Sequence, residues 1–169
     1  MLQPKDVLHL LDTCSIAYEY VEHSAVRTCE EADKLDIGIS GQAVKNIFLC
    51  DAKGLNPTLV VLKSEQRLDL RALSQTLGLK GLRFASPRRL METLGVEPGA
   101  VSLLGLCNDV QRATQVVIAE EVWNGDRILC HPLVNTATLS IAVRDMARLL
   151  EHLGFTPILT ANAAPTPDT

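Results

Sequence analysis

Two nearly unbroken aliphatic segments constrain the fold of this chain more than any other feature. Residues 58–62 read TLVVL and residues 115–119 read QVVIA. Strands with apolar side chains on both faces are typical of sheets that are covered on both sides. Helical signals lie between and around these segments, without the strict rhythm of a βαβ repeat. We therefore expect a mixed α/β (α+β) domain over residues 1–160, with one central sheet surrounded by helices.

Local end signals place most of the helices. Asp69 and Gly78 suit the N-cap and the stop of one helix, and Ser86-Pro87 suits the start of the next. Thr28 and Glu31 have the spacing of a capping box. The predicted helices span residues 5–15, 28–37, 70–77, 87–94 and 143–153. The predicted strands span residues 17–21, 43–51, 58–62, 83–84, 101–106, 115–119, 127–129 and 136–141. Residues 161–169 are expected to form a disordered C-terminal tail.

Charge and composition exclude several classes of function. The net charge is −4, with Lys+Arg 16 against Asp+Glu 20, and aromatic residues make up 4% of the chain. These values disfavour wrapping of a nucleic-acid duplex and recognition by base stacking, but they allow a small local contact. Five cysteines occur without a C-x-x-C pair, and no segment has the features of a signal peptide or a membrane span. We expect a cytoplasmic, monomeric protein without metal or organic cofactor.

Three segments carry polar residues that can serve a site. Lys45 begins an otherwise apolar strand and can point into a cleft, although the residues alone favour a surface or snorkelling lysine. The turn at Pro98-Gly99 can present bare N–H groups to a ligand, or it can simply connect a helix to a strand. Residues 131–138 combine a histidine, an asparagine and two threonines before an apolar run. Those groups can line a pocket or cap a turn.

The order of several segments resembles the YbaK/prolyl-tRNA synthetase editing-domain family, in particular its free-standing ProX-type or PrdX-type deacylases. The segments are EHSAVRTCEEAD, KNIFLCD, LVVL, LRFASPRRLMETLGVEPGAVS, GLCND and HPLVNTATLSI, and they extend from about residue 20 to residue 157. The resemblance implies a compact editing-domain fold with a central mixed, partly barrel-like sheet. It also implies hydrolysis of the ester between a wrong amino acid and the terminal adenosine of a tRNA, most of all alanyl-tRNA(Pro).

The resemblance also implies a set of site residues. Lys45 matches the lysine of the family's K-N motif, Gly99 opens its G-x-x-x-P loop, and His131 matches its cleft histidine, so these three are the expected catalytic residues. In that loop Leu103 replaces the final proline. The expected substrate-binding residues are Tyr20, Val26, Arg27, Asn46, Ala100, Ser102, Asn135 and Thr136. The implied mechanism relies on a ribose hydroxyl of the substrate and on backbone N–H groups.

Basic residues concentrate in the middle of the chain and are expected to guide the acceptor end of tRNA(Pro). They are Lys63, Arg67, Arg71, Lys80, Arg83, Arg88 and Arg89, and we assign tRNA contacts to Lys63, Arg67, Arg83 and Arg88. Prolyl-tRNA synthetase is a further candidate partner.

Two departures from the family pattern keep the substrate open. Close relatives read E-H-P-x-V-F-T, whereas this chain has Ser24 and Arg27 at the third and sixth positions. Deacylation of cysteinyl, seryl, threonyl or 2-aminobutyryl tRNA is therefore an alternative, as is a non-catalytic tRNA-binding module. A third alternative is a thiol-dependent hydrolase that uses Cys130 or Cys50.

Overall fold

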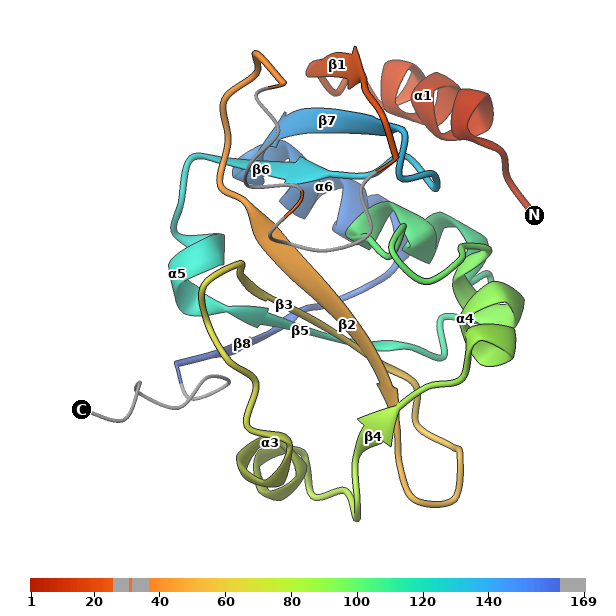
Figure 1. Ribbon diagram of the computed structural model, residues 1–169, viewed down its shortest axis with the longest axis vertical. Helices are drawn as coiled ribbons and strands as arrows, with labels where there is room; N and C mark the ends of the chain where they lie inside the picture. Colours follow the sequence, from red (N-terminus) through yellow and green to blue (C-terminus); the bar gives the residue numbers. More distant parts are fainter. Residues whose placement is uncertain (26–30, 32–36, 162–169) are drawn as a thin grey trace.

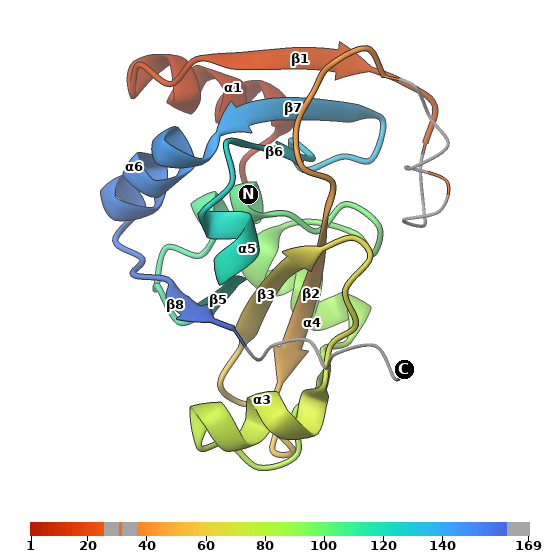
Figure 2. The ribbon, with the colours of Figure 1, turned by 90° about the vertical axis from the view of Figure 1, so that its left-hand side faces the viewer.

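The described strands form two sheets that lie one above the other (Figures 1 and 2). The computed structural model describes residues 1–25, 31 and 37–161. One sheet has three antiparallel strands in the order β1-β7-β6, with bounds Tyr18–Glu22, Ala137–Ala142 and Arg127–Cys130. The other is mixed, in the order β4-β2-β3-β5-β8, with bounds Arg83–Phe84, Val44–Cys50, Thr58–Lys63, Gln115–Ala119 and Ile158–Thr160.

The two aliphatic segments form the centre of the five-stranded sheet. β3 and β5 pair in parallel, from Thr58 opposite Gln115 to Val61 opposite Ile118. The four residues from Leu59 to Leu62 are fully buried, as expected of a strand covered on both faces. The mixed α/β class is confirmed by this arrangement.

The expectation of one central sheet is wrong, because the described strands form two sheets. Within the described residues, an isolated bridge in the chain before β2 joins the two sheets. Gln42 pairs in parallel with Ile128, and its N–H donates to the Arg127 carbonyl at 2.7 Å. A Cβ on Gly41 would lie 2.9 Å from Leu129 Cδ2 and 3.3 Å from the Ile128 carbonyl carbon, so a larger residue here would force the Leu129 side chain to shift. Beyond the bridge β2 turns away to pair with β3, and the sheets separate.

Helices cover both sheets. They are α1 (Pro4–Thr13), α3 (Leu70–Leu77), α4 (Pro87–Leu94), α5 (Glu120–Trp123), α6 (Val143–Leu153) and the 3-10 helix η1 (Leu103–Asn108). The predicted caps are confirmed: the Asp69 carboxylate accepts from the Ala72 N–H, and the Ser86 hydroxyl accepts from the Arg89 N–H. Every described helix is too short or too polar to cross a membrane.

One predicted strand is wrong, and two short elements were not predicted. Residues 101–106 were expected to be extended, but most of them lie in η1, whose first turn is capped by Ser102 through a 3.1 Å bond from the Leu104 N–H. The four-residue α5 and the three-residue β8 carry too little pattern to be recognised. The predicted helix over residues 28–37 lies outside the described residues, apart from Glu31, which is helical, and Ile37, which is not. The tail from residue 162 also lies outside them.

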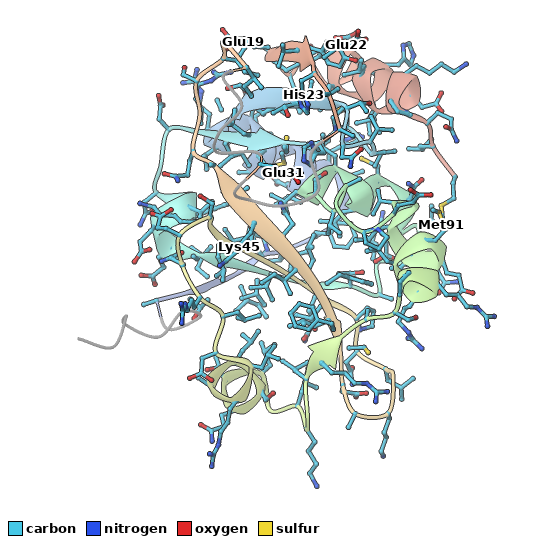
Figure 3. All side chains as sticks on the ribbon, viewed as in Figure 1. Glu19, Glu22, His23, Glu31, Lys45 and Met91 are labelled. Atoms are coloured by element: carbon cyan, nitrogen blue, oxygen red, sulfur yellow. The ribbon has the colours of Figure 1, made fainter. Side chains whose placement is uncertain are left out.

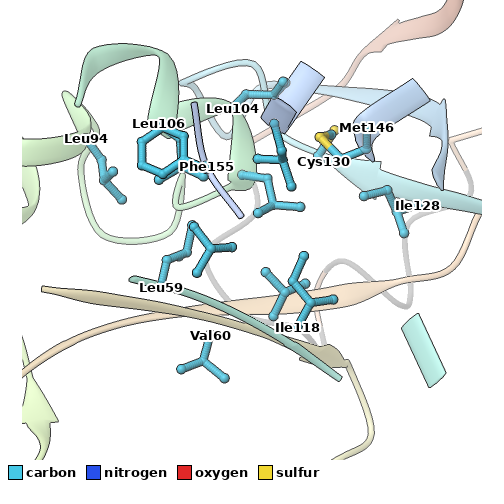
Figure 4. Packing of buried hydrophobic residues seen from close by; sticks show 14 of the residues in the cluster. Leu59, Val60, Leu94, Leu104, Leu106, Ile118, Ile128, Cys130, Met146 and Phe155 are labelled. Atoms are coloured by element: carbon cyan, nitrogen blue, oxygen red, sulfur yellow. The ribbon is translucent and has the colours of Figure 1, made fainter. Parts of the chain in front are cut away.

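The core fills the space between the two sheets (Figure 4). Leu59 and Ile118 of the five-stranded sheet face Leu104 and Leu106 of η1, with Met146 of α6 above them. All five side chains are at most 1% exposed. The site described below lies at the end of this core near the bridge between Gln42 and Ile128.

Candidate active site

Two histidines lie close together, each just after the last residue of a strand of the three-stranded sheet. His131 follows β6 and His23 follows β1, and their ring centroids are 6.2 Å apart. The His131 Nδ1 lies 2.8 Å from the Ala137 carbonyl oxygen. The His23 Nδ1 lies 2.7 Å from the Ser24 carbonyl oxygen, and its Nε2 lies 2.7 Å from the Thr138 hydroxyl. Figure 3 shows His23 at the end of β1, next to the start of β7.

These contacts determine the tautomer of each neutral ring. A carbonyl oxygen only accepts, so Nδ1 carries the proton in both histidines and Nε2 is an acceptor. The Thr138 hydroxyl therefore donates to His23. The Nε2 atom of His131 has no hydrogen-bond partner among the described residues, which leaves a lone pair for a ligand hydroxyl or a water.

Burial keeps His131 neutral. Desolvation lowers the pKa of His131 below the ordinary value of 6.5, and the nearby His23 lowers it further. The hydrogen bond to the Ala137 carbonyl opposes this shift without cancelling it. At neutral pH the side chain can therefore accept a hydrogen bond but carries no charge.

A buried serine connects the His131 segment to the loop that contains Gly99. The Ser102 hydroxyl donates to the His131 carbonyl oxygen at 2.6 Å and accepts from the Leu104 N–H. Ser102 is fully buried, so its hydroxyl positions the two backbone segments and does not face a ligand. Leu103, which replaces the family's proline, is 2% exposed and anchors the same loop in the core.

Gly99 and Asn135 line one open cavity of about 730 Å³. Gly99 has φ +93°, a backbone conformation that other residues rarely adopt, and its N–H donates no hydrogen bond within the described part of the chain. The Ala100 N–H is already bonded to the Glu97 carbonyl at 3.0 Å, and its side chain is buried. The cavity is lined by Ala25, Pro87, Arg88, Met91, Glu97, Pro98, Gly99 and Asn135.

Lys45 lies at the beginning of β2, close to the bridge between the sheets (Figure 3). Lys45 and His131 each lie three residues beyond the bridge between Gln42 and Ile128, where β2 has turned away from β6 to pair with β3. Lys45 is half-buried and forms no hydrogen bond or ion pair with any described residue. The neighbouring Asn46 is also half-buried. Neither side chain lines the cavity at Gly99.

Several predicted site residues lie elsewhere. Tyr20 is 41% exposed on the edge strand β1, and its hydroxyl donates to Glu22 at 3.1 Å. Thr136 is exposed, and its carbonyl oxygen accepts from the His23 N–H at 2.9 Å. Lys63 and Arg67 do not border the cavity, whereas Arg88 does. Val26 and Arg27 lie outside the described residues.

Three residues that border or support the site were not predicted from the sequence. Met91 and Glu97 line the cavity. Helical spacing places Met91 on the same face as Pro87, four residues earlier, so the periodicity of α4 offered a signal for it. Thr138, which holds His23, had no such signal because its partner is 115 residues away.

The described residues contain no candidate metal site. Among the residues that the structure describes, no three histidine, cysteine or acidic side chains converge in a way that could hold a metal ion.

Comparison with known proteins identifies the family to which this chain is similar. The model of a family described as the aminoacyl-tRNA editing domain matches residues 23–149. The prolyl-tRNA editing protein ProX of Acetoanaerobium sticklandii is 37% identical over 150 residues, covering 89% of this chain and 92% of the relative. A prolyl-tRNA synthetase associated domain-containing protein of Danio rerio is 36% identical, over 92% of this chain and 85% of the relative.

Solved structures share the same fold. A candidate trans-editing enzyme for prolyl-tRNA synthetase superposes with a TM-score of 0.69 at 21% identity, covering 93% of this chain and 96% of that one. At this identity the likeness concerns the fold alone.

Proposed function

Because the chain belongs to the aminoacyl-tRNA editing domain family, we propose that it hydrolyses the ester bond of mischarged tRNA(Pro), with alanyl-tRNA(Pro) as its substrate. The observation that carries this proposal is the Ser102 hydrogen bond to the His131 carbonyl, which joins the His131 segment to the loop whose Gly99 lines the cavity; the His131 side chain is not itself among the lining residues. An unbonded N–H and a neutral imidazole acceptor are thereby held on connected segments. The prolyl-tRNA editing protein ProX supports the choice of tRNA(Pro).

The geometry supports a mechanism without a nucleophilic side chain. A water molecule attacks the ester carbonyl carbon, and the Gly99 N–H stabilises the negative charge that develops on the carbonyl oxygen. The His131 Nε2 accepts a hydrogen bond from the terminal ribose or from the water, which orients the attack. The ester C–O bond then breaks, and the ribose oxygen leaves with the proton that the water lost. Lys45 binds phosphate or ribose and so positions the substrate.

Size provides the discrimination between amino acids. A pocket that admits the alanyl methyl group and excludes the larger prolyl ring spares the correctly charged tRNA. Such steric exclusion is more effective than attraction, because one extra methylene contributes only about 1–3 kcal/mol.

A deacylation panel with purified aminoacyl-tRNAs tests the proposal. We expect alanyl-tRNA(Pro) to be hydrolysed fastest and prolyl-tRNA(Pro) to remain intact. Preference for the cysteinyl, seryl, threonyl or 2-aminobutyryl ester would overturn the choice of alanine. Binding of tRNA without hydrolysis of any ester would instead identify a non-catalytic module.

The pH dependence should report the neutral state of His131. Burial lowers the pKa of His131, so the neutral form persists below pH 6.5, where an ordinary histidine becomes protonated. We expect the acidic limb of kcat/KM, after subtraction of spontaneous ester hydrolysis, to be centred below pH 6.5. The variant His131→Asn should lose this acidic limb. A limb centred above pH 7 in the wild-type protein would contradict the proposed role of His131.

Alkylation distinguishes this mechanism from thiol catalysis. Burial raises the pKa of Cys130 to about 12 and that of Cys107 to about 12, so neither forms a reactive thiolate at neutral pH. We expect iodoacetamide to leave deacylation intact, and mass spectrometry should find Cys130 unmodified until the protein is denatured. Loss of activity in step with alkylation of Cys130 or Cys50 would show thiol catalysis instead.

The partners and location follow from the same proposal. The acceptor end of tRNA(Pro) is the partner, and prolyl-tRNA synthetase is a further one that supplies the mischarged product. A monomer in the cytoplasm suits this role. The free thiols at Cys14, Cys50, Cys107 and Cys130 are the state expected in a reducing compartment.

A further inference from the structure

Two arginines converge on the turn that connects β2 to β3. A Cβ placed on Gly54 would lie 3.2 Å from the Arg89 Nη2 and 4.0 Å from the Arg83 Nη2. Arg83 comes from β4 and Arg89 from the first turn of α4, so separate elements bring the two guanidinium groups to one point. Gly54 has φ +75° and no side chain, which lets both guanidinium groups approach its backbone closely.

No carboxylate of the described residues forms an ion pair with either arginine. Within the described residues, neither guanidinium group forms an ion pair or a hydrogen bond. The nearby Asp51 carboxylate accepts from the N–H groups of Lys53 and Leu55 and from the Asn56 amide. Those bonds are internal to the turn, and they lower the pKa of Asp51, most of all through Asn56. Two like charges held together in this way lose their repulsion when an anion binds between them.

We propose that Arg83 and Arg89 together bind one backbone phosphate of the tRNA acceptor stem. Guanidinium groups are suited to this role because their planar N–H donors match phosphate oxygens in pairs. The inference rests on the proposed function and sharpens it. Two residues form a defined phosphate site, in place of a contact spread over all the basic residues in the middle of the chain.

The position of the pair relative to the active site fits an acceptor end. Arg88 lines the cavity that contains Gly99, whereas Arg89, the next residue of α4, borders a second cavity of about 770 Å³ beside the turn at Asn56. The first turn of α4 therefore borders both cavities. A strand whose terminal ribose lies near Gly99 can pass this turn and place an upstream phosphate between the two arginines.

The salt dependence of tRNA(Pro) binding tests the site. For Arg83→Gln/Arg89→Gln, we expect the slope of log Kd against log salt to decrease by about 1, as for the loss of one phosphate contact. KM for alanyl-tRNA(Pro) should rise about tenfold, which corresponds to one lost charge-assisted contact, while kcat is unchanged. The control Lys5→Gln/Arg144→Gln removes the same charge from exposed positions on α1 and α6 and should change neither quantity.

The outcomes separate the inference from the proposed function. If the wild-type protein deacylates alanyl-tRNA(Pro) but the arginine variant keeps its slope and its KM, the phosphate site is wrong. If the wild-type protein binds tRNA without deacylation and the variant loses the slope, the site is right and the function is wrong. A titration with inorganic phosphate, followed by NMR, adds a third arm. Tight binding of free phosphate at the two arginines with an unchanged tRNA slope would overturn the RNA assignment.

Discussion

Lys45→Ala is expected to reduce kcat/KM for alanyl-tRNA(Pro) by at least about a hundredfold, because loss of a positioning contact misaligns the reacting ester. Lys45 has no partner among the described residues. Its removal should therefore leave the free energy of unfolding within about 0.5 kcal/mol of the wild-type value. Single-turnover deacylation together with urea unfolding measures both quantities.

Two further variants sharpen this test. Lys45→Arg keeps the charge but changes its shape, so it should recover part of the activity if Lys45 binds phosphate. Lys5→Ala removes an exposed lysine of α1 and should deacylate as the wild-type protein does. Deacylation by Lys45→Ala at the wild-type rate would remove Lys45 from the site.

Ser102→Ala should damage both stability and activity. The substitution leaves the His131 carbonyl and the Leu104 N–H without their partner in a fully buried position. Such unsatisfied groups cost about 1–3 kcal/mol in the free energy of unfolding. The Gly99 loop and the His131 segment also lose their connection, so we expect kcat/KM to fall roughly tenfold at a temperature where the variant is folded.

The pH profile distinguishes positioning from simple destabilisation. Loosening of the His131 segment admits water, which should move the acidic limb of kcat/KM upward, toward the ordinary histidine pKa. A matched control is Ser64→Ala, because the Ser64 hydroxyl, among the residues that the structure describes, bonds only to its neighbour Glu65 at 3.5 Å. This variant should change neither stability nor the limb. An acidic limb in Ser102→Ala identical to that of the wild-type protein would show that Ser102 does not act through His131.

Residues close in sequence explain why much of the fold was predictable. The caps at Asp69 and Ser86 bond to N–H groups three residues away, and Gly78 and Gly95 end their helices with φ +67°. Each of these signals is complete within one turn of helix. The strand predicted over residues 101–106 was wrong because its sequence signal is ambiguous. Its leucines suit a buried strand or a buried helix equally, and the contact of η1 with α4 selected the helix.

The site was predictable only in part, because its members are joined by long-range contacts. The presence of Lys45, Gly99 and His131 in one protein followed from the family resemblance. That Ser102 supports His131 from 29 residues away, and that Tyr20 lies on an exposed edge strand, could not be read from the residues. Both facts depend on which strands become neighbours.

The sequence by itself determined the elements whose signals are local: the two aliphatic strands, the capped helices and the glycine at the Gly99 turn. Hydrophobic patterning and backbone conformation act over a few residues and leave their trace there. The tertiary structure alone decided that the strands form two sheets joined at Gln42. The tertiary structure also buries His131, which lowers its pKa, and it brings the guanidinium groups of Arg83 and Arg89 close to Gly54. Burial and convergence of charge depend on distances in space, which sequence spacing does not record.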